Sequence, residues 1–351
     1  MVKRSKRPTI NDVADYAGVS ISTVSRVLND SAPVEEDKAE KVRQAIEALN
    51  YQPKAAARIL ASQRTETIGL LLPLISGEYF AGMLRGVERG VIEGGYDLLI
   101  HSTYTDVRPN SPYRRVLGEH NSDGLIVFSD SLDDRELIRL AEMQFPVVLL
   151  HRSTPEGLQI PSVTVENKNG AKQIVEHLIQ ALHLIQAHHR KKIVYLRGPE
   201  EHEDSYWREI GYRQALDEAG ILFDPARVGA GNFDNHDAQD AIDAMLVDGV
   251  EFDAVFAGDD EAASGVLRAL RLANIDVPEQ VSVVGFDDSN LAGHLIPALT
   301  TIDAHIELAG YTAAKQLIQL IKRGETEPMT LLPTQLVLRR SCGCFYEEVK
   351  T

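Results

Sequence analysis

Two pairs of adjacent aspartates, Asp259-Asp260 and Asp287-Asp288, are the first residues of this sequence that could carry out chemistry. Paired carboxylates act as general acid and base, or as metal ligands, in many enzymes. The sequence contains no glycine-rich phosphate loop and no G-x-S-x-G or H-E-x-x-H motif that would accompany such catalysis. One aspartate of each pair also suits a helix cap or a turn. We therefore expect no catalytic activity.

The two cysteines, Cys342 and Cys344, stand one residue apart near the C-terminus. Structural metal sites use several Cys or His ligands at recurring spacings, and no such partner lies nearby. We expect reduced thiols, no metal and no cofactor. The N-terminus has basic residues without an apolar segment after them, and no apolar stretch is long enough to span a bilayer. These features predict a cytoplasmic protein.

A different chemistry is indicated between residues 9 and 34, where polar side chains gather on one face of a short helical pattern. This outward face, on a helix that Ser20 can cap, carries Ile21, Ser22, Ser25 and Arg26. In helix-turn-helix proteins such a face enters the major groove, where arginine can form two hydrogen bonds with guanine. The alternative is a three-helix domain that binds protein or is purely structural.

Three short helices would position this face. Thr9 and Asp12 match a capping box that starts the first helix at Ile10, and Gly18 can adopt the positive φ that ends it. The second helix would bury Val24, Val27 and Leu28. The third, after Pro33, has apolar residues at helical spacing: Ala39, Val42, Ile46 and Leu49.

Residues 53–65 form a further short helical segment. An isolated helix of fewer than roughly 12 residues rarely persists in water, so its order should depend on a partner. One such partner is the same segment of a second subunit, with Leu60 opening a base step in the minor groove. In the alternative interpretation the segment is a linker whose Leu60 packs on a neighbouring domain.

Net charge is unevenly distributed along the chain. The whole sequence carries a formal charge of -16, whereas residues 1–64 contain more basic than acidic side chains. A basic segment on an acidic body indicates that only the N-terminal end meets a polyanion. Charge alone also fits an ordinary solvated surface.

The segments TINDVADYAGVSISTVSRVLN, VRQAIEALNYQP and AAARILASQRTETIGLL resemble the lactose-repressor (LacI/GalR) family of bacterial transcription regulators. The resemblance covers nearly the whole chain and is densest in the first sixty residues. It implies that bases are read by Ile21, Ser22 and Arg26, and that Leu60 enters the minor groove with Ala57 also contacting DNA. Near the phosphates it places Thr9, Ser20, Thr23, Ser25 and Asn29.

From Ile68 onward, short apolar runs alternate with helical patterns in two successive series. The strand-like runs are IGLLLP, YDLLIHS, GLIVFS and PVVLLHR, then KIVYLRG, DAVFAGD and VSVVGFDD. Helical patterns span residues 79–94, 170–185, 206–219, 235–246 and 261–272. Two such series predict two doubly wound parallel sheets, which bind ligands beyond the carboxyl ends of their strands. We expect two lobes with a cleft between them.

The expected fold is an all-α helix-turn-helix domain (1–52), a hinge helix and linker (53–65) and an α/β core (66–351). The resemblance implies a periplasmic-binding-protein-like core in which the chain crosses between the lobes near Val165, Ala292 and Pro328. One lobe would then comprise about 66–165 and 293–327. The other would comprise about 166–292 and 328–345.

The resemblance also implies which side chains hold a small-molecule effector in the cleft. These are Tyr79, Phe80, His151, Arg208, Phe233, Asp259 and Asp287. A guanidinium and carboxylates over an aromatic face suit the vicinal hydroxyls of a sugar. Locally, Asp259 can instead cap a helix and Phe233 can be part of the core. His151 departs from the family pattern because many relatives have an aspartate there, and Ala304 replaces a polar side chain.

Together these observations predict a DNA-binding transcriptional regulator without enzymatic activity. It would be a homodimeric repressor on a pseudo-palindromic double-stranded operator, controlled allosterically by a carbohydrate effector. A nucleobase or nucleoside effector is the alternative. Two other classes are a sugar-binding protein without regulatory function, against which residues 9–62 argue, and an enzyme.

Overall fold

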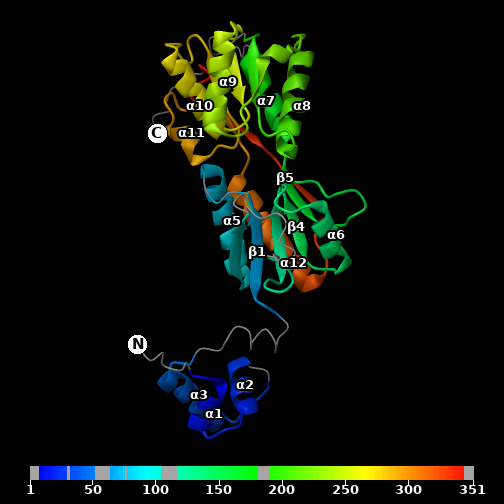
Figure 1. Ribbon diagram of the computed structural model, residues 1–351, viewed down its shortest axis with the longest axis vertical. Coiled ribbons are helices and arrows are strands. Elements are labelled where there is room, and N and C mark those ends of the chain that lie inside the picture. Colours follow the sequence, from blue (N-terminus) through cyan, green and yellow to red (C-terminus); the bar gives the residue numbers. More distant parts are fainter. Residues whose placement is uncertain are drawn as a thin grey trace, which may run out of the picture. The chain divides into compact units, whose positions relative to one another are not determined.

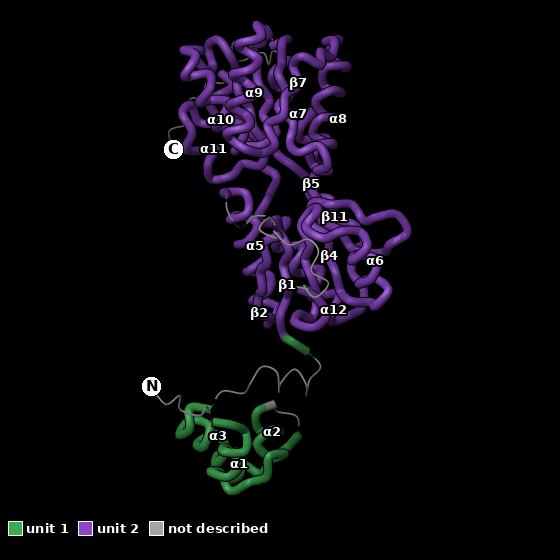
Figure 2. The backbone as a smooth tube through the Cα atoms, viewed as in Figure 1, with its two compact units in different colours: residues 1–65 green, residues 66–351 purple. Residues whose placement is uncertain are grey.

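The computed structural model describes residues 8–29, 32–51, 64–73, 75, 77–103, 117–180 and 190–343. The chain divides into two compact units, residues 1–65 and residues 66–351 (Figure 1, Figure 2). Ala57 and Leu60 of the expected hinge helix lie outside the described residues, and so does Cys344.

The first unit consists of α1 (Ile10–Ala17), α2 (Ile21–Asn29) and α3 (Glu36–Leu49). At the start of α1 the Thr9 backbone N–H donates to Asp12, and the Asp12 N–H donates to the Thr9 hydroxyl. Gly18 ends the helix with φ at 65°. The capping box and the glycine turn predicted from the sequence are therefore confirmed.

Small and branched side chains form the core of the first unit. Val13, Val24 and Val42, one from each helix, are completely buried. Ala14 and Ala45 are also buried, which lets α1 and α3 pack closely. Partly buried side chains around this core include Val27, Leu28, Ile46 and Leu49. The helices thus need few large side chains to pack together.

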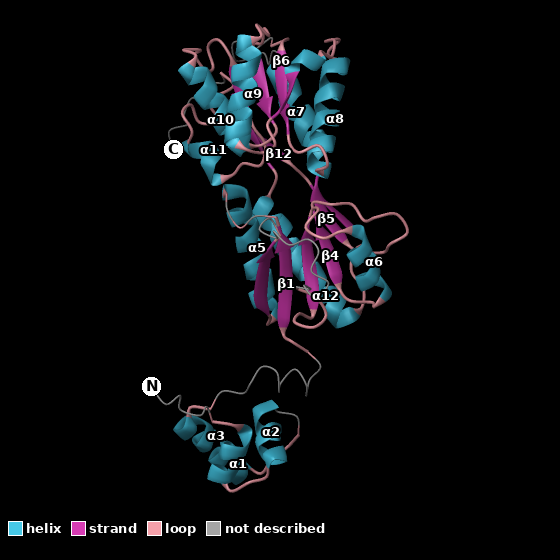
Figure 3. Ribbon diagram, in the orientation of Figure 1, coloured by secondary structure: helices cyan, strands magenta, loops and turns pink. Residues whose placement is uncertain are grey.

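The second unit contains two parallel sheets (Figure 3), which confirms the predicted α/β core. The first sheet has the order β11 (Met329–Leu332), β5 (Ser162–Val165), β4 (Val147–Leu150), β3 (Gly124–Phe128), β1 (Thr67–Leu72) and β2 (Asp97–Ser102). The second has the order β7 (Val228–Ala230), β6 (Ile193–Arg197), β8 (Ala254–Ala257) and β9 (Ser282–Val284).

Helices cover both sheets. Against the first sheet lie α5 (Glu78–Gly94), α6 (Asp134–Glu142) and α12 (Ile306–Arg323). The second lobe contains α7 (Asn167–Ile179), α8 (Glu203–Glu218), α9 (Asn235–Val247), α10 (Asp260–Leu272), α11 (Asn290–His294) and a short 3-10 turn at Pro225–Arg227. Strand residues alternate between the two faces: Leu70 packs in the cluster with α5 and α12, and Leu71 in the cluster with α6.

Helices α5 and α12 pack so closely that the backbone of one helix contacts the backbone of the other. A Cβ atom on Gly86 would lie 1.9 Å from the Glu307 carbonyl oxygen, so this crossing requires glycine.

The chain crosses between the lobes later than the sequence predicts at two of three places. The first crossing follows Val165, where β5 ends and α7 begins. Ala292 is buried in the core of the second lobe, so the second crossing lies after β10 (Thr301–Asp303) and not near Ala292. The third lies after Leu332 and not near Pro328, because β11 pairs with β5. The strands next to these two later crossings, β10 and β12 (Gln335–Val337), pair as an antiparallel ribbon.

Among the described helices, none combines the length and apolar character needed to cross a membrane.

Candidate functional site

The exposed face of α2 begins with a cluster of hydroxyl groups. The Ser20 hydroxyl accepts the backbone N–H of Thr23 at 3.2 Å and lies 2.8 Å from the hydroxyls of Ser22 and Thr23. This cap fixes the first turn of α2. Unpaired N–H groups and the positive end of the helix dipole favour an anion such as phosphate at this position.

The α2 residues that were predicted to read bases face away from the core. Ile21, Ser22 and Arg26 are exposed, with Ile21 50% accessible, whereas Val24 between them is completely buried. Thr23 and Ser25, predicted to lie near phosphates, are half-buried. The helix therefore presents a mixed polar and apolar surface that can approach base edges.

The remaining residues assigned to DNA contact lie at helix ends or outside the described chain. Thr9 stands at the start of α1, with its hydroxyl donating to Asp12 at 2.7 Å, and Asn29 is the last residue of α2. Ala57 and Leu60 lie outside the described residues.

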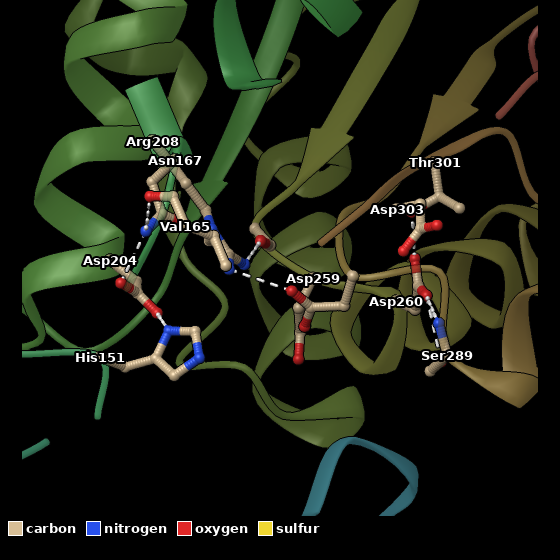
Figure 4. Close-up of polar contacts among 12 residues, drawn as sticks. His151, Val165, Asn167, Asp204, Arg208, Asp259, Asp260, Ser289, Thr301 and Asp303 are labelled. Atoms are coloured by element: carbon tan, nitrogen blue, oxygen red, sulfur yellow. Dashed lines mark hydrogen bonds and ion pairs between the residues drawn. The ribbon is translucent and has the colours of Figure 1, made fainter. Parts of the chain in front are cut away.

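Arg208, on α8, is the centre of a buried polar network in the second unit (Figure 4). Its Nε donates to Asn167 Oδ1 at 2.9 Å, one terminal nitrogen donates to the Gly258 carbonyl at 2.6 Å, and the other to Asp287 Oδ1 at 3.0 Å. The guanidinium carbon lies 3.8 Å from the ring centre of Phe286 and 5.4 Å from that of Phe233. All three guanidinium nitrogens thus have protein partners.

A second buried pair joins the two lobes. His151 directly follows β4 of the first sheet, and its Nδ1 lies 2.8 Å from Asp204 Oδ2 on α8. The other carboxylate oxygen of Asp204 accepts the Asn167 side-chain N–H at 2.7 Å. Burial raises the pKa of Asp204, but the charge and hydrogen bond of His151 outweigh it and hold that pKa below its usual range. Asp204 therefore connects His151 to the Arg208 network.

The two aspartates predicted for the cleft have raised pKa values. Burial, followed by the charge of Asp287, raises the pKa of Asp259 to about 8. Burial also raises the pKa of Asp287, and the Arg208 guanidinium opposes that increase. Asp259 accepts the backbone N–H of Ala262 at 2.8 Å, so it also caps α10, as the local alternative proposed. At neutral pH its carboxyl group carries a proton that it can donate.

Asp260, which the sequence offers either as one of a possible catalytic pair or as a helix cap, has a different role in the structure. Its two oxygens accept the Thr301 hydroxyl at 2.6 Å and the Ser289 backbone N–H at 2.7 Å. Burial and then the charge of Asp287 raise its pKa well above the usual value. Asp260 therefore fastens the loop that carries Asp287 to the start of α10.

Aromatic rings from both lobes meet beside this network. The ring of Phe128 at the end of β3 lies 5.9 Å from Tyr79, 5.5 Å from His151 and 6.2 Å from His202. Phe80 and Phe233 extend the group on either side. We call Tyr79, Phe80, Phe128, His151, His202 and Phe233 the aromatic cluster.

Three polar atoms of the aromatic cluster are buried without a partner among the described residues: the Tyr79 hydroxyl, His151 Nε2 and His202 Nδ1. Burial lowers the pKa of His202, which keeps its ring neutral. Leaving a buried polar atom without a hydrogen bond costs about 1 to 3 kcal/mol, so these atoms are candidates for hydrogen bonds to a polar ligand or to water.

A cavity of about 390 Å³ lies where α5 and α12 face the loop after β9. Of the seven predicted effector residues, Asp287 lines this cavity, while the other six are absent from its lining. The lining also includes Arg85 and Arg89, which pair with Glu307, and Asp303. The structure thus brings the predicted residues together around Arg208 and the aromatic cluster, and the cavity opens beside them.

Sequence reasoning missed Asn167, Asp204, His202 and Phe128. Asn167 and Phe128 lie at or just after strand ends, where ligands of parallel sheets bind. Asp204 stands four residues before Arg208, on the same face of α8. The position after a strand and the four-residue spacing from Arg208 could therefore have identified Asn167, Phe128 and Asp204 from the sequence.

A helix-turn-helix unit joined to a two-lobed parallel α/β core defines a class of DNA-binding regulators. The family model "Bacterial regulatory proteins, lacI family" matches residues 9–54, and "Periplasmic binding protein-like domain" matches residues 181–342. The chain belongs to the lacI family of bacterial regulatory proteins, and its relatives are transcriptional regulators rather than enzymes.

Curated relatives match over almost their full length. The chain is 36% identical to the HTH-type transcriptional regulator RegA of Clostridium saccharobutylicum over 95% of this chain and 98% of RegA. It is 34% identical to CelR of Thermobifida fusca over 97% of this chain and 100% of CelR. It is 33% identical to GalR of Escherichia coli over 95% of this chain and 94% of GalR.

Solved structures show the same architecture. A CelR–cellobiose complex superimposes with a TM-score of 0.68 at 31% identity, covering 95% of this chain and 100% of that one. The lac repressor dimer bound to operator and an anti-inducer superimposes with a TM-score of 0.81 at 27% identity, covering 96% of this chain and 99% of that one.

Proposed function

We propose that this regulator is a homodimeric repressor whose affinity for a pseudo-palindromic operator is set by a neutral carbohydrate bound between the lobes of its core. The observation that carries the proposal is a group of three atoms around Phe128, contributed by both lobes, that are buried without a partner among the described residues. A ligand that satisfies these atoms holds the lobes together. The solved complex of CelR with cellobiose supports a carbohydrate effector, and that of the lac repressor dimer with operator supports a dimer that binds an operator.

The charges of the cleft favour a neutral ligand over a phosphorylated one. Binding of a phosphate group needs free cationic donors, yet Arg208 already donates to Asn167, Gly258 and Asp287. The two arginines of the cavity lining, Arg85 and Arg89, form ion pairs with Glu307. Asp204, Asp259 and Asp287 bring further acidic groups to the same region. Neutral hydroxyl groups can instead accept from protonated Asp259 and donate to a histidine nitrogen.

Control of DNA binding would follow from movement of the lobes. Two α2 helices of a dimer would enter successive major grooves, while paired 53–65 segments would place Leu60 in the central minor groove. A ligand changes this equilibrium only through a difference in its affinity for the two arrangements of the lobes. Coupling of this kind amounts to about 1 to 3 kcal/mol.

A thermal-shift screen of the full chain tests the effector class. The panel contains neutral mono- and oligosaccharides, sugar phosphates, nucleobases and nucleosides. We expect neutral sugars to raise the melting temperature and the other classes to leave it unchanged. Stabilisation by a sugar phosphate or a nucleobase, with no response to any neutral sugar, would contradict the proposed effector.

A further inference from the structure

The first two turns of α8 bury charged side chains and expose aromatic ones. Asp204 and Arg208 are buried, whereas Tyr206 and Trp207 are 56% and 40% exposed. The buried charges belong to the network around Arg208. Single exposed apolar residues are common on protein surfaces, but two adjacent large aromatic rings next to a polar site are characteristic of binding surfaces.

The ring of Trp207 is held in place by hydrogen bonds at the junction of the two lobes. Its Nε1 donates to Glu203 Oε1 at 3.2 Å. The Glu203 carboxylate also accepts the Ser153 backbone N–H at 2.6 Å and the Ser153 hydroxyl. Ser153 lies in the connection between β4 and β5 of the first lobe. Trp207 therefore stands where the first lobe contacts α8.

Tyr206 completes a corner-shaped aromatic surface. Its ring centre lies 5.1 Å from that of Trp207, with the two rings inclined at 73°. We call Tyr206 and Trp207 the aromatic corner. Trp207 satisfies its own N–H through Glu203, so the corner presents ring faces and edges together with the Tyr206 hydroxyl.

The aromatic corner adjoins the effector cleft. Glu203 is next in sequence to Asp204, which contacts His151, and His151 lies two residues before Ser153. The same two segments thus form the inner contact at His151 and the outer contact at Ser153. Trp207 therefore lies at the outer edge of this contact between the lobes.

We propose that Tyr206 and Trp207 form an outer subsite that stacks against a second sugar ring, so that the effector is an oligosaccharide. The inference rests on the proposed function, because the first ring of that ligand occupies the cleft. The apolar faces of a pyranose pack on aromatic rings, and the Glu203 carboxylate can accept its hydroxyl groups. The outer subsite adds affinity for each ligand of two or more rings.

Trp207 is the only tryptophan of the sequence, so the intrinsic fluorescence of the unlabelled full-length protein reports on this position. The probes are glucose, galactose and xylose, together with their β-1,4-linked oligomers of two to four units. Calorimetry measures binding of each sugar, and fluorescence measures contact with Trp207. We expect oligomers to bind more tightly than the monosaccharide and to shift the emission, whereas a monosaccharide binds without a shift.

Two substitutions and a control sharpen the test. Trp207→Ala should weaken oligosaccharide binding roughly tenfold while retaining monosaccharide affinity, because the aromatic anchor of the outer ring is lost. Trp207→Phe should recover part of that loss, since a ring face remains. The control is Leu222→Ala, which removes an exposed apolar side chain (91% exposed) after the other end of α8 and should change neither affinity.

Three results would overturn the outer subsite. In the first, an oligosaccharide binds Trp207→Ala as tightly as the unmodified protein and does not shift the emission of the unmodified protein. This result rules out the outer subsite and leaves the proposed cleft function intact. Dimer dissociation in Trp207→Ala with unchanged sugar affinity identifies the aromatic corner as a protein contact. Failure of every sugar to bind in calorimetry contradicts the proposed function itself, and the subsite with it.

Discussion

The α2 face and the cleft of residues 66–351 present polar side chains in opposite ways. On α2, Ile21, Ser22 and Arg26 are exposed over a core of small apolar residues. In the cleft, Arg208 and Asp287 are buried and paired. The first region can change its contact residues at little cost to folding. The second cannot, because each buried charge depends on its partner.

This comparison shows where binding and stability are coupled. Surface substitutions generally change the free energy of unfolding by less than about 0.5 kcal/mol, so recognition on α2 is separable from folding. The cleft network holds the same side chains that would meet the ligand. Occupation of the cleft should therefore change the relative stability of lobe arrangements, which is what allosteric control requires.

The largest expected effect is on folding of the core. Arg208→Met leaves Asp287, Asn167 and the Gly258 carbonyl without their buried donor, so we expect a loss of about 3 to 5 kcal/mol in the free energy of unfolding. Tryptophan fluorescence in a urea titration measures it, since Trp207 lies on α8. The matched control is Arg213→Met on the same helix, where the exposed pair with Glu209 contributes about 1 kcal/mol or less. An equal loss of unfolding free energy in Arg208→Met and Arg213→Met would contradict the contrast between buried and exposed charges.

The next effect should appear in DNA recognition without a change in folding. Arg26→Ala removes the long cation of the α2 face, and loss of a bidentate base contact costs about 1 to 3 kcal/mol of discrimination. Operator binding measured with a set of single-base variants should show relaxed preference at particular positions. Unchanged specificity, or a large drop in thermal stability, would remove the role assigned to Arg26.

A pH-dependent effect should distinguish the cleft from the α2 face. Asp259, with a pKa of about 8, is protonated at neutral pH and loses its donor proton as pH rises through that value. Sugar affinity should therefore fall by up to about tenfold per pH unit above pH 8.

Asp259→Asn keeps both the helix cap and a donor, so its sugar affinity should be flat over the same range. Calorimetric titrations from pH 6.5 to 9.5 measure both proteins. A pH dependence that persists in Asp259→Asn would assign the proton to another group. The raised pKa also means that ionised Asp259 destabilises the fold, so its contribution becomes less favourable as pH rises from about 4 to 8.

The smallest effect concerns the local structure of the first unit. Thr9→Ala removes the capping box of α1 and should cost about 1 kcal/mol. Hydrogen exchange should show faster opening of α1 amides, with no change in the amides of residues 66–351. Equal acceleration in both units would indicate that the units do not unfold separately.

The sequence predicted the first unit and the strands of the core well because their signals are local. Thr9, Asp12 and Gly18 mark the start and end of α1 through backbone chemistry that needs no distant partner. The run IGLLLP has the apolar continuity of a strand buried on both faces, which is how β1 lies in its sheet.

The lobe crossings and part of the cleft depend on contacts between distant segments. β11 joins the first lobe by pairing with β5, about 165 residues earlier in the chain, and no local pattern indicates that pairing. The bond between His151 and Asp204 likewise spans 53 residues. The sequence around His151 does not indicate a carboxylate partner, because that partner, Asp204, is brought to it by the packing of α8.

The central claim is that a ligand in the cleft controls DNA affinity, and operator binding with and without saturating sugar tests it most directly. We expect the sugar to change the operator Kd of the full chain by about 5- to 150-fold. An operator Kd that is the same with and without a bound sugar would contradict the account.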